Sequence, residues 1–159
     1  FKDVKVSSWF GKYVIDLYND GIINGTSATT YAPNDTLTWA AALKLLLVSH
    51  GDLKAADATG ADWSKNAIAK AAELGLVAAD LDGAKAISRL EFCQVAAKLN
   101  KLAESKTESK FTDCTDGYVM ALVDAKVISG MTETTFEPAA SLTRAQIAKI
   151  LYQLTLIEK

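Results

Sequence analysis

The sequence contains few of the residues that build metal centres or cross-linked scaffolds. Its 159 residues include one histidine, two cysteines and two prolines. A single histidine with two separated thiols provides no ligand set for zinc. With half of the residues hydrophobic and so little proline, the composition indicates a folded globular chain. No apolar run approaches the roughly 20 residues of a transmembrane helix, and a formal net charge of −2 argues against a large nucleic-acid footprint.

Motifs of an enzyme are also missing from the sequence. It shows no Ser–His–Asp order and no glycine-rich phosphate loop. Asp80 and Asp82 form an acidic pair, and paired carboxylates can hydrolyse a glycosidic bond. These two residues lie in a short polar loop without a partner motif. The sequence therefore predicts no catalytic activity, no cofactor and no bound metal.

One unit is repeated along the chain. Residues 21–25 (GIING) align with 126–130 (KVISG), and residues 30–33 (TYAP) align with 135–138 (TFEP) at the same offset. The middle third follows the same order through residues 75–77 (GLV), but its loop is shorter and lacks the aromatic-x-Pro turn. We therefore expect three copies. They cover residues 1–51, residues 52–100 with the shortened loop, and residues 110–159, with a linker at 101–109.

Each copy is expected to form a helix, a loop and a second helix. In the first copy, Val14 and Leu17 lie on one apolar stripe at helical spacing. Gly21 and Gly75 stand where a helix commonly ends in a left-handed residue. Lys126 takes this position in the third copy, whose first helix is therefore expected to end differently.

The second helix of each copy is expected to begin after a hydroxyl residue. Ser88 with Glu91, and Thr143 with Gln146, have the spacing of a capping box, in which the two side chains bond each other's backbone N–H groups. Thr38 provides the cap in the first copy, without an acid or amide three residues later.

Arg89 and Arg144 follow two of these caps, at a helix end where a cation is disfavoured. An exposed arginine is tolerated there because solvent screens its charge. The alternative is that the guanidinium and free helix N–H groups together form a pocket for an anion. The recurrence at matched positions favours the anion pocket.

The unit also carries a family likeness in its order of motifs. It opens with an aromatic residue, an acid and a tryptophan, continues through a glycine-flanked apolar pair, and closes on a hydroxyl-Arg-Ala-amide helix start. Here these are Phe1-x-Asp3-Val4 with Trp9, Gly21-Ile22-Ile23-x-Gly25, Tyr31-x-Pro33 and Thr143-Arg144-Ala145-Gln146. The pattern resembles the S-layer homology domain, which normally occurs as three tandem copies. The resemblance covers essentially the whole chain.

This resemblance implies a mainly α fold, with three helix-loop-helix repeats in a pseudo-threefold arrangement around a central three-helix bundle. It implies a non-catalytic module that anchors exported proteins to the bacterial envelope. The expected location is therefore extracellular, at the cell wall or S-layer, with an appended surface-protein domain as a partner. In Gram-positive relatives the ligand is a secondary cell-wall polysaccharide that carries pyruvate ketals.

The resemblance also implies ligand-binding residues in grooves between the copies. The arginine of the closing motif is typically a binding residue, beside a groove-lining glycine and the aspartate of the opening motif. A ketal carboxylate suits a guanidinium at a helix N-terminus. Sugar faces suit aromatic walls such as Trp9, Tyr31, Trp63 and Phe136, for which core packing is the alternative. For the aspartates the alternative is a local cap or turn. The candidate set is Thr143, Arg144, Gln146, Ser88, Arg89, Glu91, Trp39, Gly25, Gly130, Asp3, Asp57 and Asp113.

The three copies depart from the family pattern in different ways. Trp39 replaces the arginine of the first copy. The groove at this position is therefore either silent, meaning that it binds no ligand, or it stacks the indole on a sugar ring. Ala79 replaces the groove glycine of the second copy, and the third copy lacks a tryptophan matching Trp9. We expect unequal grooves, with those of Arg89 and Arg144 the better binding sites.

Two further questions stay open at the level of sequence. Cys93 and Cys114 could form a disulfide in an exported protein. Burial as small hydrophobic residues is the favoured interpretation, because Cys93 lies on an apolar helix face and Cys114 aligns with Val4. The alternative function is a degenerate repeat trimer that binds peptidoglycan or mediates protein–protein contact in the envelope.

Overall fold

The computed structural model describes residues 1–157, and this part of the chain contains six α-helices and no strand. The helices are α1 (Gly11–Asn19), α2 (Trp39–His50), α3 (Trp63–Glu73), α4 (Arg89–Leu99), α5 (Gly117–Asp124) and α6 (Arg144–Thr155). The prediction of a mainly helical fold is confirmed. None of the helices in residues 1–157 is long and apolar enough to cross a membrane.

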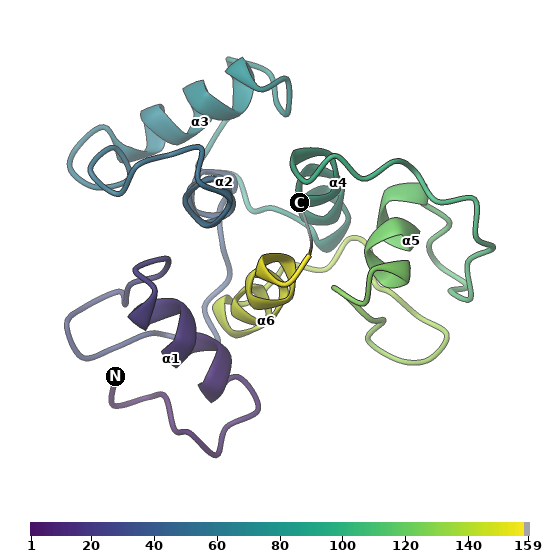
Figure 1. Cartoon of the computed structure of the whole chain (residues 1–159), viewed down its shortest axis with the longest axis horizontal. Coiled ribbons are helices and arrows are strands. Elements are labelled where there is room, and N and C mark those ends of the chain that lie inside the picture. The colour runs from purple at the N-terminus through teal and green to yellow at the C-terminus, as the bar shows by residue number, and fades with distance from the viewer. Residues whose placement is uncertain (158–159) are drawn as a thin grey trace.

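Three inner helices, α2, α4 and α6, lie at the centre of the view in Figure 1, with α1, α3 and α5 around them. Each outer helix packs on the inner helix of another copy: α3 on α2, α5 on α4, and α1 on α6. The last of these contacts brings the first copy against the third. The pseudo-threefold symmetry and the limits of the copies stay predictions.

The inner helices carry most of the buried side chains. Leu43 and Leu47 of α2, Phe92 of α4, and Ile147 and Leu151 of α6 are all inaccessible to solvent. Burial of such side chains contributes roughly 1.5–3 kcal/mol each, so the centre of the molecule provides much of its stability.

The two cysteines belong to this hydrophobic core as unpaired thiols. Cys93 is inaccessible to solvent on α4, and its burial raises the pKa of the thiol to about 12. Cys114 is buried before α5, and burial raises its pKa as well. Both side chains therefore act as small apolar groups.

The outer helices all end in a left-handed residue. Gly21 and Gly75 have φ values of 75°. Lys126 has a φ of 61°, and its N–H donates to Val123 O at 3.0 Å, just as the N–H of Gly21 donates to Tyr18 O at 3.0 Å. The expectation that the third copy ends its helix differently is wrong, because lysine adopts the conformation that glycine adopts in the other copies.

The inner helices begin at the predicted caps. Both capping boxes are complete: Ser88 with Glu91 before α4, and Thr143 with Gln146 before α6. Thr38 accepts a hydrogen bond from the N–H of Ala41, at 3.2 Å, before α2. Each cap fixes the direction in which the first residue of its helix projects.

A loop from another copy docks onto the start of each inner helix. For α6, the N–H of Arg144 donates to Asp35 O at 2.8 Å, and the N–H of Ala145 donates to Pro33 O at 2.9 Å. Equivalent pairs of bonds recur at the other two inner helices. They join Arg89 to Ala140, Leu90 to Pro138, Trp39 to Lys85 and Ala40 to Gly83.

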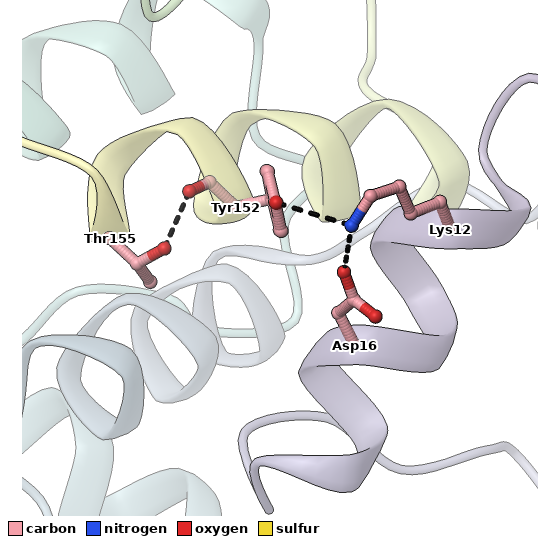
Figure 2. Close-up of polar contacts among 4 residues, drawn as sticks. All are labelled: Lys12, Asp16, Tyr152 and Thr155. Atoms are coloured by element: carbon pink, nitrogen blue, oxygen red, sulfur yellow. Dashed lines mark hydrogen bonds and ion pairs between the residues drawn. The ribbon is translucent and has the colours of Figure 1, made fainter.

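These docked loops form a closed cycle, because the first copy caps the third, the third caps the second, and the second caps the first. The contact between α1 and α6 closes the same cycle through side chains (Figure 2). Lys12 of α1 contacts the carboxylate of Asp16, and its ammonium donates to the hydroxyl of Tyr152 on α6 at 3.3 Å. The ring of Tyr13 packs on that of Tyr152, with 5.2 Å between centroids.

Candidate ligand-binding grooves

Arg144 begins α6 and extends its side chain across the loop of the first copy. Its Nε donates to Tyr31 O at 2.7 Å, and its Nη2 donates to Asn24 O at 2.8 Å. The guanidinium carbon lies 4.5 Å from the centre of the Tyr31 ring. The two hydrogen bonds and the cation–π contact fix the guanidinium plane at the junction of two copies.

Arg89 makes the same set of contacts with the loop of the third copy. Its Nε donates to Phe136 O at 2.9 Å, its Nη2 donates to Ser129 O at 3.4 Å, and its guanidinium carbon lies 4.6 Å from the Phe136 ring centre. Only 4% of Arg89 is exposed. In residues 1–157 no carboxylate lies within ion-pair distance of it.

Burial lowers the pKa of Arg89 from its ordinary value of 12.5, and the fields of Glu137 and Asp113 partly oppose that shift. The guanidinium remains charged at neutral pH. Its Nη1 makes no hydrogen bond to any residue in the described range, yet no buried side-chain polar atom there lacks a partner. Nη1 is therefore the donor that Arg89 presents to solvent.

Arg89 lines a hollow of about 140 Å³, which we call the Arg89 groove. It is assembled from all three copies. Trp9, which is 58% exposed, comes from the first copy, Arg89 comes from the second, and Gln146 and Lys149 project from α6. The remaining lining residues are Val127, Ile128, Ser129, Gly130, Met131 and Ile150.

The helix N-termini do not supply the free N–H groups that the sequence suggested. At α4 the first two N–H groups bond loop carbonyls of the third copy, and the N–H of Glu91 bonds the hydroxyl of Ser88. The expected combination of a guanidinium with free helix N–H groups is therefore wrong. The cations that remain in the Arg89 groove are the side chains of Arg89 and Lys149.

Arg144 has a matched set of neighbours, and by analogy with the Arg89 groove we call the set of Arg144, Asn24, Gly25, Lys44 and Trp63 the Arg144 groove. Lys44 stands in α2 where Lys149 stands in α6, and its ammonium lies 5.3 Å from the Trp63 ring centre. Burial, and then the charge of Arg144, lowers the pKa of Lys44. An arginine, a lysine and an indole therefore occur together in the Arg144 groove, as they do in the Arg89 groove.

The third junction has lost these features. Trp39, at the position of the arginines, is only 8% exposed and belongs to the core. Gln94 stands where the other copies have Lys44 and Lys149, and its amide donates to the carboxylate of Asp116 at 2.9 Å. This junction therefore presents neither the arginine nor the lysine of the other two.

The groove glycines are required by close packing. A Cβ atom at Gly130 would lie 2.5 Å from a ring carbon of Phe111, and one at Gly25 would lie 2.5 Å from a ring carbon of Phe1. Both positions lie in close turns that a side chain would obstruct. Gly130 also lines the Arg89 groove, whereas ligand binding by either glycine stays a prediction.

Two of the three candidate aspartates hold loops. The Asp3 carboxylate accepts hydrogen bonds from the N–H groups of Tyr31 and Ala32 at 2.9 and 2.8 Å. Asp113 accepts two equivalent bonds in the third copy at 2.8 and 2.9 Å. These backbone bonds lower the pKa of both carboxyls. Asp57 is exposed and, within the described residues, its carboxylate holds no such loop.

Sequence reasoning missed the lysines of the grooves. Lys44 and Lys149 stand at the same distance after their cap residues, Thr38 and Thr143, so the internal alignment could have identified them. The proposed aromatic walls separate into two kinds. Trp9 is exposed to the groove, whereas Tyr31 and Phe136 are buried beneath the arginines.

Comparison with known proteins gives a family and several relatives. The profile of the S-layer homology domain matches residues 1–43 and 112–148, together about half of the chain. An endoglucanase of Bacillus sp. is 29% identical over 97% of this chain and 18% of its own length. The surface-layer 125 kDa protein of Lysinibacillus sphaericus is 38% identical over 48% of this chain and 7% of its own length. An amylopullulanase of Thermoanaerobacterium thermosulfurigenes is 26% identical over 97% of this chain and 9% of its own length.

Proposed function

Because this chain belongs to the S-layer homology domain family, we propose that it is a non-catalytic module that attaches a larger protein to the bacterial cell wall. The chain spans at most 18% of the length of the relatives described above. Two of these relatives bear the names of glycan-degrading enzymes and one that of a surface-layer protein. A catalytic or array-forming domain appended to this module would fit that pattern, with the cell surface as its location.

The buried guanidinium of Arg89, without a carboxylate partner, is the observation on which this proposal rests. A buried charge is costly unless an opposite charge or hydrogen bonds compensate it. Two carbonyls and an aromatic face do so in part, Nη1 makes no hydrogen bond to a described residue, and Arg89 lines the groove. An anionic ligand would complete the compensation.

The ligand that we infer is a secondary cell-wall polysaccharide that carries pyruvate ketals. Each ketal has a single carboxylate, which Arg89 Nη1 and the ammonium of Lys149 could bind together. The exposed indole of Trp9 offers a flat apolar wall for a sugar face. No bond in the ligand needs to be broken for this role, which is binding alone.

We further infer that two grooves bind and one does not. The Arg89 and Arg144 grooves each combine an arginine, a lysine and an indole. The third junction has Trp39 and an amide that is already bonded to Asp116. Of the two interpretations of Trp39, the silent groove is favoured because its indole is buried.

The test uses variants that remove charge from the grooves without removing the arginines, since these also hold loops together. We expect Lys149→Gln to weaken binding to purified pyruvylated polysaccharide about tenfold, which corresponds to about 1.4 kcal/mol. Lys44→Gln should have a similar effect at the other groove, and the double variant should lose retention on cell-wall material. Lys65→Gln, at an exposed position of α3, changes the net charge by the same amount as each groove variant and serves as the control.

Removal of the pyruvate from the polymer should reproduce the double variant. Equal binding of the native and the depyruvylated polymer would contradict the carboxylate site. Binding to bare peptidoglycan, or to no wall fraction at all, would instead favour the alternative of peptidoglycan or protein–protein contact.

A further inference from the structure

A second hollow of about 480 Å³ adjoins the Arg89 groove, and we call it the Lys126 pocket. It shares Lys149 and residues 127–129 with that groove, so the two are continuous. It is formed between α5, α6 and the start of the third copy, with one residue from α1. The complete lining is Tyr13, Lys110, Val123, Lys126, Val127, Ile128, Ser129, Lys149 and Gln153.

The charged groups that line the Lys126 pocket are all cations. Lys110, Lys126 and Lys149 are exposed, and no aspartate or glutamate is among the lining residues. None of the three ammonium groups makes a hydrogen bond or ion pair with a residue in the described range. A concave surface lined by one sign of charge concentrates counter-ions of the opposite sign.

The first copy contains a matched hollow that lacks these features. It has Gly21 where the third copy has Lys126, and Val48 where the third copy has Gln153. Lys44 is its one charged lining residue, and its volume is about 30 Å³. The large basic pocket is therefore not a general product of the repeat geometry but a property of the third copy.

The backbone at Lys126 gives an independent reason to expect a role for this side chain. Its φ of 61° lies in the left-handed region, where residues with a Cβ atom are disfavoured. Gly21 and Gly75 fill the same position at a φ of 75° in the other copies. The left-handed turn ends α5 as it ends the other outer helices, but the position favours glycine, so a lysine that occupies it and also lines the cavity is a candidate functional residue.

We propose that the Lys126 pocket binds a doubly charged oxyanion, specifically a phosphate monoester such as that of a sugar phosphate. Three ammonium groups exceed what a single carboxylate would neutralise, and lysine binds phosphate as a point charge. The hydroxyls of Tyr13 and Ser129 and the amide of Gln153 supply hydrogen bonds to further oxygens. This site adjoins the carboxylate site in the Arg89 groove and shares Lys149 with it, whereas Lys110 and Lys126 belong to the Lys126 pocket alone.

The test is an NMR titration of the whole chain, at low salt and neutral pH, with inorganic phosphate and with a hexose 6-phosphate. We expect saturable chemical-shift changes of the amides of residues 126–129, with a millimolar dissociation constant that increases as salt is added. Tighter binding of the hexose phosphate would identify a phosphorylated saccharide as the source. Equal or weaker binding of the hexose phosphate would overturn the assignment to a phosphate monoester.

Lys126→Gly restores the residue of the other copies, so the variant should fold, and we expect it to weaken phosphate binding at least fivefold. Lys110→Gln should have a similar effect, and Lys65→Gln should have none. Shifts that do not saturate, or equal affinity in Lys126→Gly and Lys65→Gln, would overturn the proposal. Because the probe is phosphate alone, the outcome is independent of whether the chain binds pyruvylated wall polymer.

Discussion

Tyr31 of the first copy and Arg144 of the third bond each other through both side chains and both main chains. The Nε of Arg144 donates to the carbonyl of Tyr31 at 2.7 Å, and the hydroxyl of Tyr31 donates to the carbonyl of Arg144 at 2.9 Å. The guanidinium also lies over the ring, and Tyr31 is only 1% exposed. The residue that we propose for ligand binding is thus coupled to the packing of the first copy against the third.

Tyr31→Phe should lower the free energy of unfolding by about 1 kcal/mol, because it removes the hydrogen bond from the Tyr31 hydroxyl to the Arg144 carbonyl. Urea unfolding monitored by circular dichroism measures this loss. Tyr18→Phe is the matched control, since Tyr18 is half exposed and should tolerate the change. Phe136 shows that the fold accepts phenylalanine in the equivalent place. Equal stability of the two variants would mean that the Tyr31 hydroxyl contributes nothing.

The sequence predicts this fold well where the interactions are local. The capping boxes depend on residues three apart, such as Thr143 and Gln146, and the glycine turns depend on backbone conformations that only a few residue types favour. The helical stripes are also local, because their period follows from helix geometry. These elements could be predicted without knowing how the copies pack.

The failures of prediction concern contacts between copies. The N–H of Arg144 is occupied by Asp35 of another copy, and nothing in the local spacing around α6 indicates that partner. The same is true of Arg89, because nothing in the sequence near α4 indicates that a loop of the third copy buries its guanidinium. Propensity likewise disfavours Lys126 in a left-handed turn, yet the chain adopts that turn after α5.

The two backbone hydrogen bonds that the Asp113 carboxylate accepts form a clamp on the loop of the third copy, and this clamp should make stability depend on pH in the acid range. Hydrogen bonds from the N–H groups of Phe136 and Glu137 lower the pKa of Asp113 below its ordinary value of 3.8. The carboxylate therefore stabilises the folded chain above that value, and this contribution is lost as pH falls through the lowered pKa. Asp113→Asn should melt at a lower temperature than the native chain at neutral pH.

The difference in melting temperature between Asp113→Asn and the native chain should shrink as the solution is acidified below pH 3.8, because the native carboxyl becomes neutral too. Thermal melts of both proteins across this range measure it. Asp57→Asn is the control, because Asp57 is exposed and makes no such clamp among the described residues. A difference that stays constant with pH would contradict the role of the charged carboxylate.

Gly130→Ala should be more damaging than Gly21→Ala, although only Gly21 has a left-handed backbone. A Cβ atom at Gly130 would meet the Phe111 ring and the carbonyl oxygens of Thr132 and Thr135, each at 2.5 Å. We expect a loss of about 2 kcal/mol from this overpacking. At Gly21 no atom lies within 4 Å of the new Cβ, so the cost is the backbone strain alone, about 1 kcal/mol.

The two glycine variants also separate stability from ligand binding. Gly130 lines the Arg89 groove. Displacement of its loop would move Ser129, whose carbonyl accepts a hydrogen bond from Arg89. We therefore expect Gly130→Ala, but not Gly21→Ala, to weaken binding to wall polysaccharide at temperatures where both variants are folded. Chemical denaturation and a polysaccharide pull-down on the same preparations test both expectations. An affinity for the polysaccharide equal to that of Gly21→Ala would show that the Arg89 groove is not one of the two sites of attachment.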